Sequence, residues 1–154
     1  MPWAGDGTTA EYRTMTEISA STANQQPLDT DELIEQRVSA LIGRASRRQL
    51  WLLFLDDDDI QLPMLVPIDD FPVQPRPADA HALATGVAAI MESAGAVRVI
   101  LVWERYAGAD LSQLDRAWAR QLSAECAAAG VPVRAQLLSH KRGVRWIAPD
   151  DYLG

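Results

Sequence analysis

The sequence predicts a single α/β domain, with a mixed sheet of five strands and about three helices in the order α-β-β-α-β-α-β-β. Three features indicate this fold. The run VRVILVW (Val97–Trp103) is almost wholly apolar, which is typical of a strand buried on both faces of a sheet. A helical pattern follows it and leads into another strand, so the two strands should form a parallel pair with a right-handed crossover. The chain has 154 residues, enough for one domain with a core of its own.

Residues 1–27 form a predicted flexible tail, and residues 28–154 form the predicted domain. The tail is rich in small and polar residues without sustained periodicity, as in segments that cannot bury a core. Its larger apolar side chains are expected to dangle or to dock weakly: Trp3, Tyr12, Met15 and Ile18. The first helix is expected to begin near Asp29, which forms a capping box with Glu32, and Gly43 can end it.

A hairpin is predicted next. The apolar run Leu50–Leu55 should be its first strand and Ile60–Ile68 its second. The aspartates Asp56–Asp59 lie between them and predict the turn, because an Asp side chain bonds to nearby backbone N–H groups. Pro63 and Pro67 each remove a donor from the strand ladder, so the second strand is expected at the sheet edge.

Two further helices and two further strands complete the fold. Apolar periodicity predicts helices over Ala78–Ala94 and Leu111–Ala129, and strands over Val131–Leu138 and Val144–Ala148. Asp110 with Gln113 matches a capping box for the second of these helices. The Asp110 side chain would then accept from the free backbone N–H groups at the start of that helix. Right-handed crossovers place both helices on one face of the sheet. The other face also needs a cover, either the first helix or a second subunit.

Composition narrows the classes of function. The net charge of −7 argues against a sequence-independent nucleic-acid binder, because such binding depends on phosphate neutralisation by Lys and Arg. The cluster of Arg44, Arg47 and Arg48 keeps nucleic-acid association as the weakest alternative. The single cysteine, Cys126, excludes an intrachain disulfide and is expected in the core. Neither a signal peptide nor a membrane-spanning run is visible, so a cytoplasmic protein without a membrane partner is expected.

The carboxyl ends of the two parallel strands form the candidate site, because ligands tend to bind beyond such ends. Three residues there are catalytic candidates, as carboxylate, nucleophile and imidazole base: Glu104, Ser139 and His140. Three more could hold an anion: Arg105, Lys141 and Arg142. However, no G-x-S-x-G nucleophile elbow and no Walker A sequence occurs.

The aspartate run raises the question of a Ca²⁺ or Mg²⁺ site, with Asp56 and Asp58 as candidate ligands. A calcium loop needs spaced acids, a glycine and a distal Glu, and DDDDIQLP has neither of the latter two. A solvated turn is the favoured interpretation, and no metal or cofactor is expected.

The segment from Arg48 to the end resembles small actinobacterial proteins of unknown function. The similar stretches are RQLWLLFLDDDD, LPMLVPIDD, RVILVWER, LDRAWARQLSAECAAAGVPVRA and GVRWIAP, and the resemblance covers about two-thirds of the chain. It implies a shared fold and a bacterial cytoplasmic setting. It assigns no activity, so no functional residue is carried over.

The leading hypothesis is a non-catalytic protein-interaction or regulatory module, with a protein partner or a second copy of the chain on the uncovered sheet face. A small hydrolase that uses the polar cluster at Glu104 and His140 is the first alternative. Nucleic-acid association through the Arg cluster is the second. A pocket that contains both Glu104 and His140 would favour the hydrolase.

Overall fold

Five strands form one mixed sheet in the computed structural model, which describes residues 26–153. The strands are β1 (Gln49–Leu55), β2 (Gln61–Ile68), β3 (Arg98–Glu104), β4 (Val133–His140) and β5 (Gly143–Trp146). Their order is β2-β1-β3-β4-β5; β3 and β4 are parallel and the other neighbours are antiparallel. The predicted mixed five-stranded α/β fold is therefore confirmed. The tail residues Trp3, Tyr12, Met15 and Ile18 lie outside the described residues.

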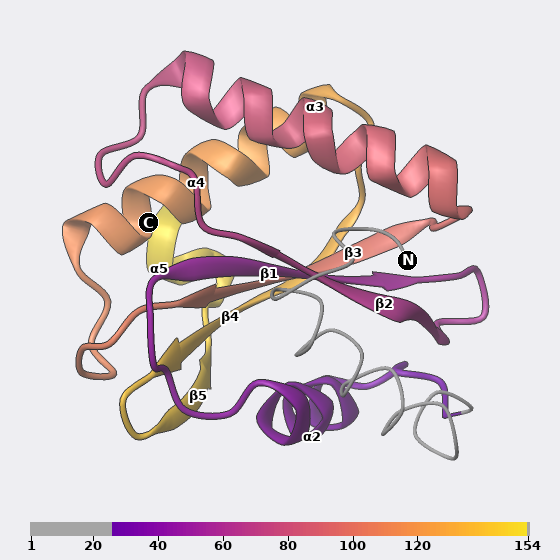
Figure 1. Ribbon diagram of the computed structural model, residues 1–154, viewed down its shortest axis with the longest axis horizontal. Helices are drawn as coiled ribbons and strands as arrows, with labels where there is room; N and C mark the ends of the chain where they lie inside the picture. The colour runs from indigo at the N-terminus through magenta and orange to yellow at the C-terminus, as the bar shows by residue number, and fades with distance from the viewer. Residues whose placement is uncertain (1–25, 154) are drawn as a thin grey trace.

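Helices cover both faces of this sheet (Figure 1). Helices α3 (Pro77–Ala94) and α4 (Gln113–Ala128) lie on one face, as the crossover rule predicts, and α2 (Asp31–Leu41) lies on the other. A further short helix, α5 (Pro149–Leu153), follows β5 and was not predicted. None of the helices within the described part of the chain is long and apolar enough to cross a membrane.

The central strands are buried on both sides, because alternate side chains enter two separate cores. On the α3/α4 side, Leu101 of β3 packs in a core with Trp118 and Cys126 of α4. On the α2 side, Ile100 packs in a core with Val38. Helix α2 thus covers the face that a second subunit could have covered. A homo-oligomer stays a prediction.

The β1–β2 hairpin turns at the aspartates, as expected. The Asp56 carboxylate accepts hydrogen bonds from the backbone N–H groups of Asp58 (2.8 Å) and Ile60 (3.0 Å). Asp59 adopts a left-handed φ of 63°, which Asp tolerates better than most residues. Strand β2, which contains Pro63 and Pro67, lies at the sheet edge as predicted.

The predicted capping boxes of α2 and α4 are wrong by one and two residues. Thr30, not Asp29, caps α2, and its hydroxyl accepts a hydrogen bond from the backbone N–H of Leu33 (3.2 Å). Ser112, not Asp110, caps α4, in a capping box with Asp115. The reason is the same in both cases: several neighbouring residues have the chemistry of a cap, and the path of the incoming chain selects one of them.

Candidate functional site

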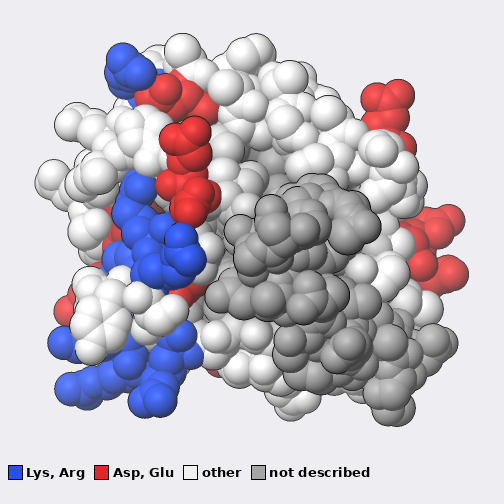
Figure 2. Space-filling view, in the orientation of Figure 1, with Lys and Arg blue, Asp and Glu red and all other residues white. Residues whose placement is uncertain are grey.

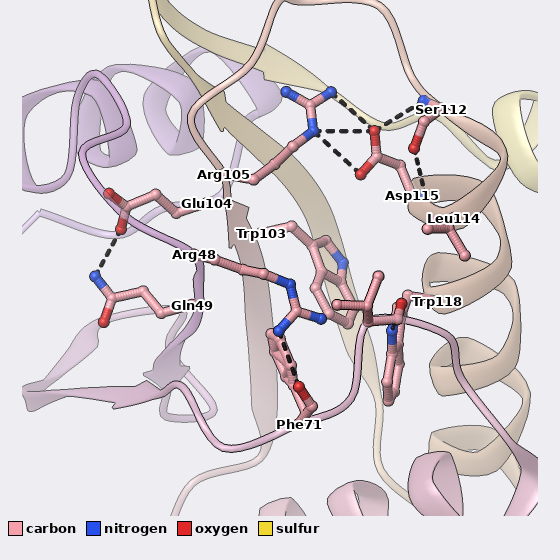
Figure 3. Close-up of a pocket in the computed structure, with 11 residues that line it drawn as sticks. Arg48, Gln49, Phe71, Trp103, Glu104, Arg105, Ser112, Leu114, Asp115 and Trp118 are labelled. Carbon is pink, nitrogen blue, oxygen red and sulfur yellow. Dashed lines mark hydrogen bonds and ion pairs between the residues drawn. The ribbon is translucent and has the colours of Figure 1, made fainter.

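A pocket of about 200 Å³ opens at the carboxyl end of β3 (Figure 3). Strand β3 and the residue after it contribute Trp103, Glu104 and Arg105. The start of α4 contributes Ser112, Leu114, Asp115 and Trp118. The opposite wall comes from Arg48 and Gln49 and, in the connector 69–76 between β2 and α3, from Phe71 and Val73. The pocket therefore lies where the sheet end, a helix start and an irregular segment meet.

Three aromatic rings form the apolar part of the pocket. Phe71, Trp103 and Trp118 contact one another in tilted pairs, with ring centroids 5.4 to 5.9 Å apart. This separation and tilt are favourable for aromatic pairs, because the edge of one ring approaches the face of another. The cluster thus provides a rigid apolar surface.

The two indole N–H groups of the cluster have partners within the protein. Trp118 donates to the carbonyl oxygens of Pro72 and Val73, both at 3.1 Å, and so fixes the connector against α4. Trp103 donates to the side-chain oxygen of Gln136 at 2.8 Å. Neither indole therefore offers a free N–H donor to the pocket.

Glu104 is buried, and its carboxylate accepts hydrogen bonds from four residues. The backbone N–H groups of Ser46 (2.7 Å) and Arg47 (3.1 Å) and the side-chain N–H groups of Gln49 (2.7 Å) and Trp51 (2.8 Å) donate to it. Burial raises the pKa of Glu104, but these donors together outweigh burial, so its pKa lies below the ordinary value. Glu104 is therefore a carboxylate at neutral pH, with both oxygens engaged.

Ser139 lies opposite Glu104 in the β3–β4 register and is fully buried. Its hydroxyl donates to the carbonyl oxygen of Gly43 at 2.5 Å. His140 is the next residue and points to the other face of the sheet, because side chains alternate along a strand. Its Nδ1 accepts a hydrogen bond from the backbone N–H of Arg142 at 3.3 Å.

The pKa of His140 lies below its ordinary value. Partial burial is the largest cause, followed by the positive charges of Arg105, Arg145 and Arg142. The imidazole is therefore neutral at neutral pH, and its Nδ1 already accepts one hydrogen bond.

The three catalytic candidates lie at neighbouring positions of the β3–β4 pair, but their side chains do not form a hydrogen-bonded chain. No side-chain hydrogen bond joins Glu104, Ser139 and His140 in the part of the chain that the structure describes, and the pocket at Glu104 includes neither of the other two. The expected pairing of Glu104 with His140 is absent, because the two side chains lie on opposite faces. The hydrolase alternative stays a prediction.

Of the three candidate anion ligands, Arg105 is engaged within the protein. Its guanidinium binds both carboxylate oxygens of Asp115, at 2.8 to 3.2 Å, and the carbonyl oxygens of Gly108 and Asp110. Asp115 also accepts from the backbone N–H of Ser112 at 2.8 Å. Burial raises the pKa of Asp115, but the hydrogen bonds and charge of Arg105 and the hydrogen bonds of Ser112 outweigh burial, so the pKa lies below its ordinary value.

The other two candidates, Lys141 and Arg142, are exposed, and their side chains form no hydrogen bond or ion pair within residues 26–153. They are thus available to a partner. Their role in holding an anion stays a prediction.

Arg48 stands out among the charged residues that line the pocket. Its guanidinium stacks over the Phe71 ring, 4.1 Å from the ring centroid, and donates to the carbonyl oxygens of Phe71 and Pro72, both at 2.8 Å. Within the described residues no carboxylate forms an ion pair with it. Burial lowers its pKa, as expected for a cation that has lost water without gaining an anion.

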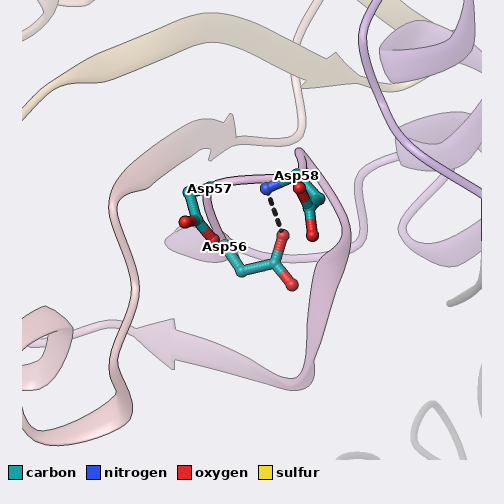
Figure 4. A group of neighbouring side chains, drawn as sticks. All are labelled: Asp56, Asp57 and Asp58. Carbon is teal, nitrogen blue, oxygen red and sulfur yellow. Dashed lines mark hydrogen bonds between the residues drawn. The ribbon is translucent and has the colours of Figure 1, made fainter.

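The candidate metal ligands lie in the β1–β2 turn (Figure 4). A carboxylate oxygen from each of Asp56, Asp57 and Asp58 can be chosen so that all three lie within 4.8 Å of one another. However, one oxygen of Asp56 already accepts two backbone hydrogen bonds of the turn. The solvated turn explains these aspartates without a metal ion, and the metal site stays a prediction.

No protein-family model matches this chain, and no curated protein matches it significantly. The resemblance to small actinobacterial proteins therefore stays a prediction. The functional assignment depends on the geometry of the pocket.

Proposed function

We propose that this protein is a non-catalytic interaction module, which receives an apolar side chain of a partner protein in the pocket at the carboxyl end of β3. The main support is the position of the exposed apolar residues. Within residues 26–153 the large apolar side chains that are exposed are Val73, Tyr106, Leu114 and Leu153. Two of these line the pocket, and Tyr106 follows the pocket residue Arg105. Exposed apolar groups that gather around a concave site are typical of protein-binding surfaces.

The size of the pocket favours an anchoring side chain over a whole small molecule. Its volume of about 200 Å³ is below the 300 to 1,000 Å³ that is typical of small-molecule sites. Partner proteins often insert one aromatic or aliphatic side chain into a well-packed pocket of this kind, and such a side chain contributes much of the binding energy.

The charged groups of the wall also favour binding over catalysis. The carboxylates of Glu104 and Asp115 are ionised and accept hydrogen bonds from donors within the chain. Neither carboxylate is therefore suited to transfer a proton near neutral pH. Arg105 is occupied by Asp115. The pocket thus offers an apolar lining, and the charged groups in its wall are already held in place by partners within the chain.

The experiment is an NMR titration of the full chain with uncharged amino-acid analogues, N-acetyl-leucinamide and N-acetyl-phenylalaninamide. Binding in the pocket should shift the methyl signals of Val73 and Leu114 and the indole signal of Trp118, with millimolar affinity as expected for a single anchor. The Leu153 methyl signals, outside the pocket, should not move.

A matched pair of variants makes this experiment specific. Val73→Asp places a charge at the mouth of the pocket and should abolish the shifts, whereas Leu153→Asp places the same charge at another exposed apolar position and should preserve them. The proposal fails if neither analogue shifts the pocket signals of the wild type. It also fails if dilution alone moves these signals, because the occupant would then be a second copy of the chain.

A further inference from the structure

We infer that the partner segment is acidic, and that its carboxylates lie against a cationic surface beside the pocket while its apolar side chain occupies the pocket. This inference rests on the proposed function. The cationic surface consists of Arg44, Arg48, Lys141 and Arg142. Arg48 is the member that also lines the pocket, so the surface and the pocket are continuous.

Backbone hydrogen bonds hold the segments that carry these cations together. The backbone N–H of Ala45, next to Arg44, donates to the carbonyl oxygen of His140 at 2.8 Å. The backbone N–H of Lys141 donates to the carbonyl oxygen of Ala107, in the loop after β3, at 3.0 Å. The loop before β1, the loop after β3 and the β4–β5 turn therefore meet at one end of the sheet. In Figure 2 the visible Lys and Arg side chains gather mainly along that side of the molecule.

The four cations lack the acidic partners that six other Arg residues of the described chain have. Ion pairs neutralise several others: Arg47 with Asp69, Arg76 with Asp79, Arg98 with Asp59, Arg105 with Asp115, Arg134 with Asp31 and Arg145 with Asp151. Between residues 26 and 153 no carboxylate pairs with a cation of the surface. On a chain of net charge −7, these four cations thus remain without an ion pair among the described residues.

This charge arrangement is complementary to a segment that has carboxylates next to an apolar side chain. Complementary potentials across an interface speed association and select the partner, even where each ion pair adds little affinity. Arg48 would gain most, since it is half-buried and an incoming carboxylate would replace the water that it has lost.

An acidic protein segment fits this site better than a nucleic acid does. Single-stranded nucleic acids bind by stacking successive bases on open aromatic faces. At this end of the sheet Tyr106 offers such a face, at 70% exposure, but Trp103 is 8% exposed and Trp118 4%, so the indole rings of the pocket do not extend it into a stacking platform.

The experiment compares three short peptides with a central Phe, flanked on both sides by Glu, by Gln or by Lys. Binding to the full chain is measured by fluorescence anisotropy. At low ionic strength the Glu-flanked peptide should bind on the order of tenfold more tightly than the Gln-flanked one, and the Lys-flanked peptide more weakly than both. About 1 M salt should remove most of this difference, because it shortens the Debye length to about 3 Å.

Charge reversal locates the effect. The triple variant Arg44→Glu, Lys141→Glu, Arg142→Glu should lose the preference for the Glu-flanked peptide and keep its affinity for the Gln-flanked one. All three side chains are exposed, so the fold should survive. Arg120→Glu is the matched control: Arg120 is an exposed cation of α4 without an ion pair within the described residues, and its reversal should preserve the preference.

The outcomes separate the two proposals. Equal binding of the Glu-flanked and Gln-flanked peptides would overturn this inference and leave the proposed function standing. Absence of binding by all three peptides would overturn both. Tighter, salt-sensitive binding of a thymidine oligonucleotide that the triple variant abolishes would overturn this inference in favour of a nucleic-acid partner.

Discussion

Glu104 and Asp115 are two largely buried carboxylates at the same end of the sheet, and the protein stabilises their charges in different ways. Glu104 accepts only from neutral donors, among them two backbone N–H groups of the loop before β1 and the Ser46 hydroxyl. Asp115 pairs with the guanidinium of Arg105 and forms the capping box of α4. Both have a pKa below the ordinary value, but the first depends on dipoles and the second largely on a cation.

This difference indicates separate tasks. Glu104 joins the loop 44–48 to the end of β3, so it fixes one wall of the pocket and the position of Arg48. Asp115 joins the loop after β3 to the start of α4, so it fixes the other wall. Because the side-chain donors to Glu104 belong to the buried Gln49 and the half-buried Trp51, its loss should leave both unsatisfied, whereas loss of Asp115 mainly frees an Arg that can reach water.

The largest effect is expected for Glu104→Ala. It leaves the side-chain donors of Gln49 and Trp51 without an acceptor, and the free energy of unfolding should fall by about 3 kcal/mol or more. Glu104→Gln keeps the shape and one acceptor, and should cost less. Urea denaturation of both variants measures the difference. A loss below about 1 kcal/mol for the Ala variant would contradict the importance assigned to these two side-chain donors.

A smaller effect is expected for Asp115→Asn, which removes the ion pair with Arg105 but keeps an oxygen that can accept from Ser112. The free energy of unfolding should fall by about 1 to 2 kcal/mol. The side chains of Arg105 and Asp115 are 18% and 15% exposed, so salt reaches them in part. About 1 M salt should therefore reduce the loss for Asp115→Asn and leave the loss for Glu104→Ala nearly unchanged. Equal salt sensitivity would remove the distinction between the two carboxylates.

The smallest effect is the contribution of each carboxylate to the pH dependence of stability. Each pKa is lower in the folded state than in the unfolded chain, where 4.5 for Glu104 and 3.8 for Asp115 are the reference values. Each group thus stabilises the fold above the unfolded pKa, and this contribution is lost as the pH falls through the folded pKa. The free energy of unfolding, measured from about pH 6 downward, should decline less steeply in Glu104→Gln and in Asp115→Asn than in the wild type. Parallel curves for wild type and variants would contradict the lowered pKa values.

The elements of the fold were predictable because their signals are local. Two continuous apolar runs indicate β1 and β3, helical periodicity indicates α3 and α4, and the prolines indicate that β2 is an edge strand. The caps were not predictable to the residue, because Asp29 and Thr30, like Asp110 and Ser112, have equivalent hydrogen-bonding chemistry. In the second pair the Arg105 side chain bonds to the backbone of Asp110, and the helix begins after Ser112.

The site was predictable only in its location. The sequence indicates that Glu104 and His140 end neighbouring strands, but which side chains share a face depends on the register, and a shift of one residue reverses it. The pocket itself was not predicted. Phe71 and Val73 lie in a proline-rich connector without periodicity. No local pattern in the sequence shows that Trp118 of α4 holds this connector against the helix.

The way in which this connector is attached has a consequence for how binding specificity can change. Arg48 and Trp118 bind it through the carbonyl oxygens of Phe71, Pro72 and Val73, groups that every amino acid supplies. Residues at exposed positions such as Val73 can therefore be exchanged while the path of the chain is retained. The Phe71 ring is fixed by its packing, but the exposed side chains of this main-chain-anchored segment are a natural place for evolution, or for protein engineering, to alter which partner is recognised.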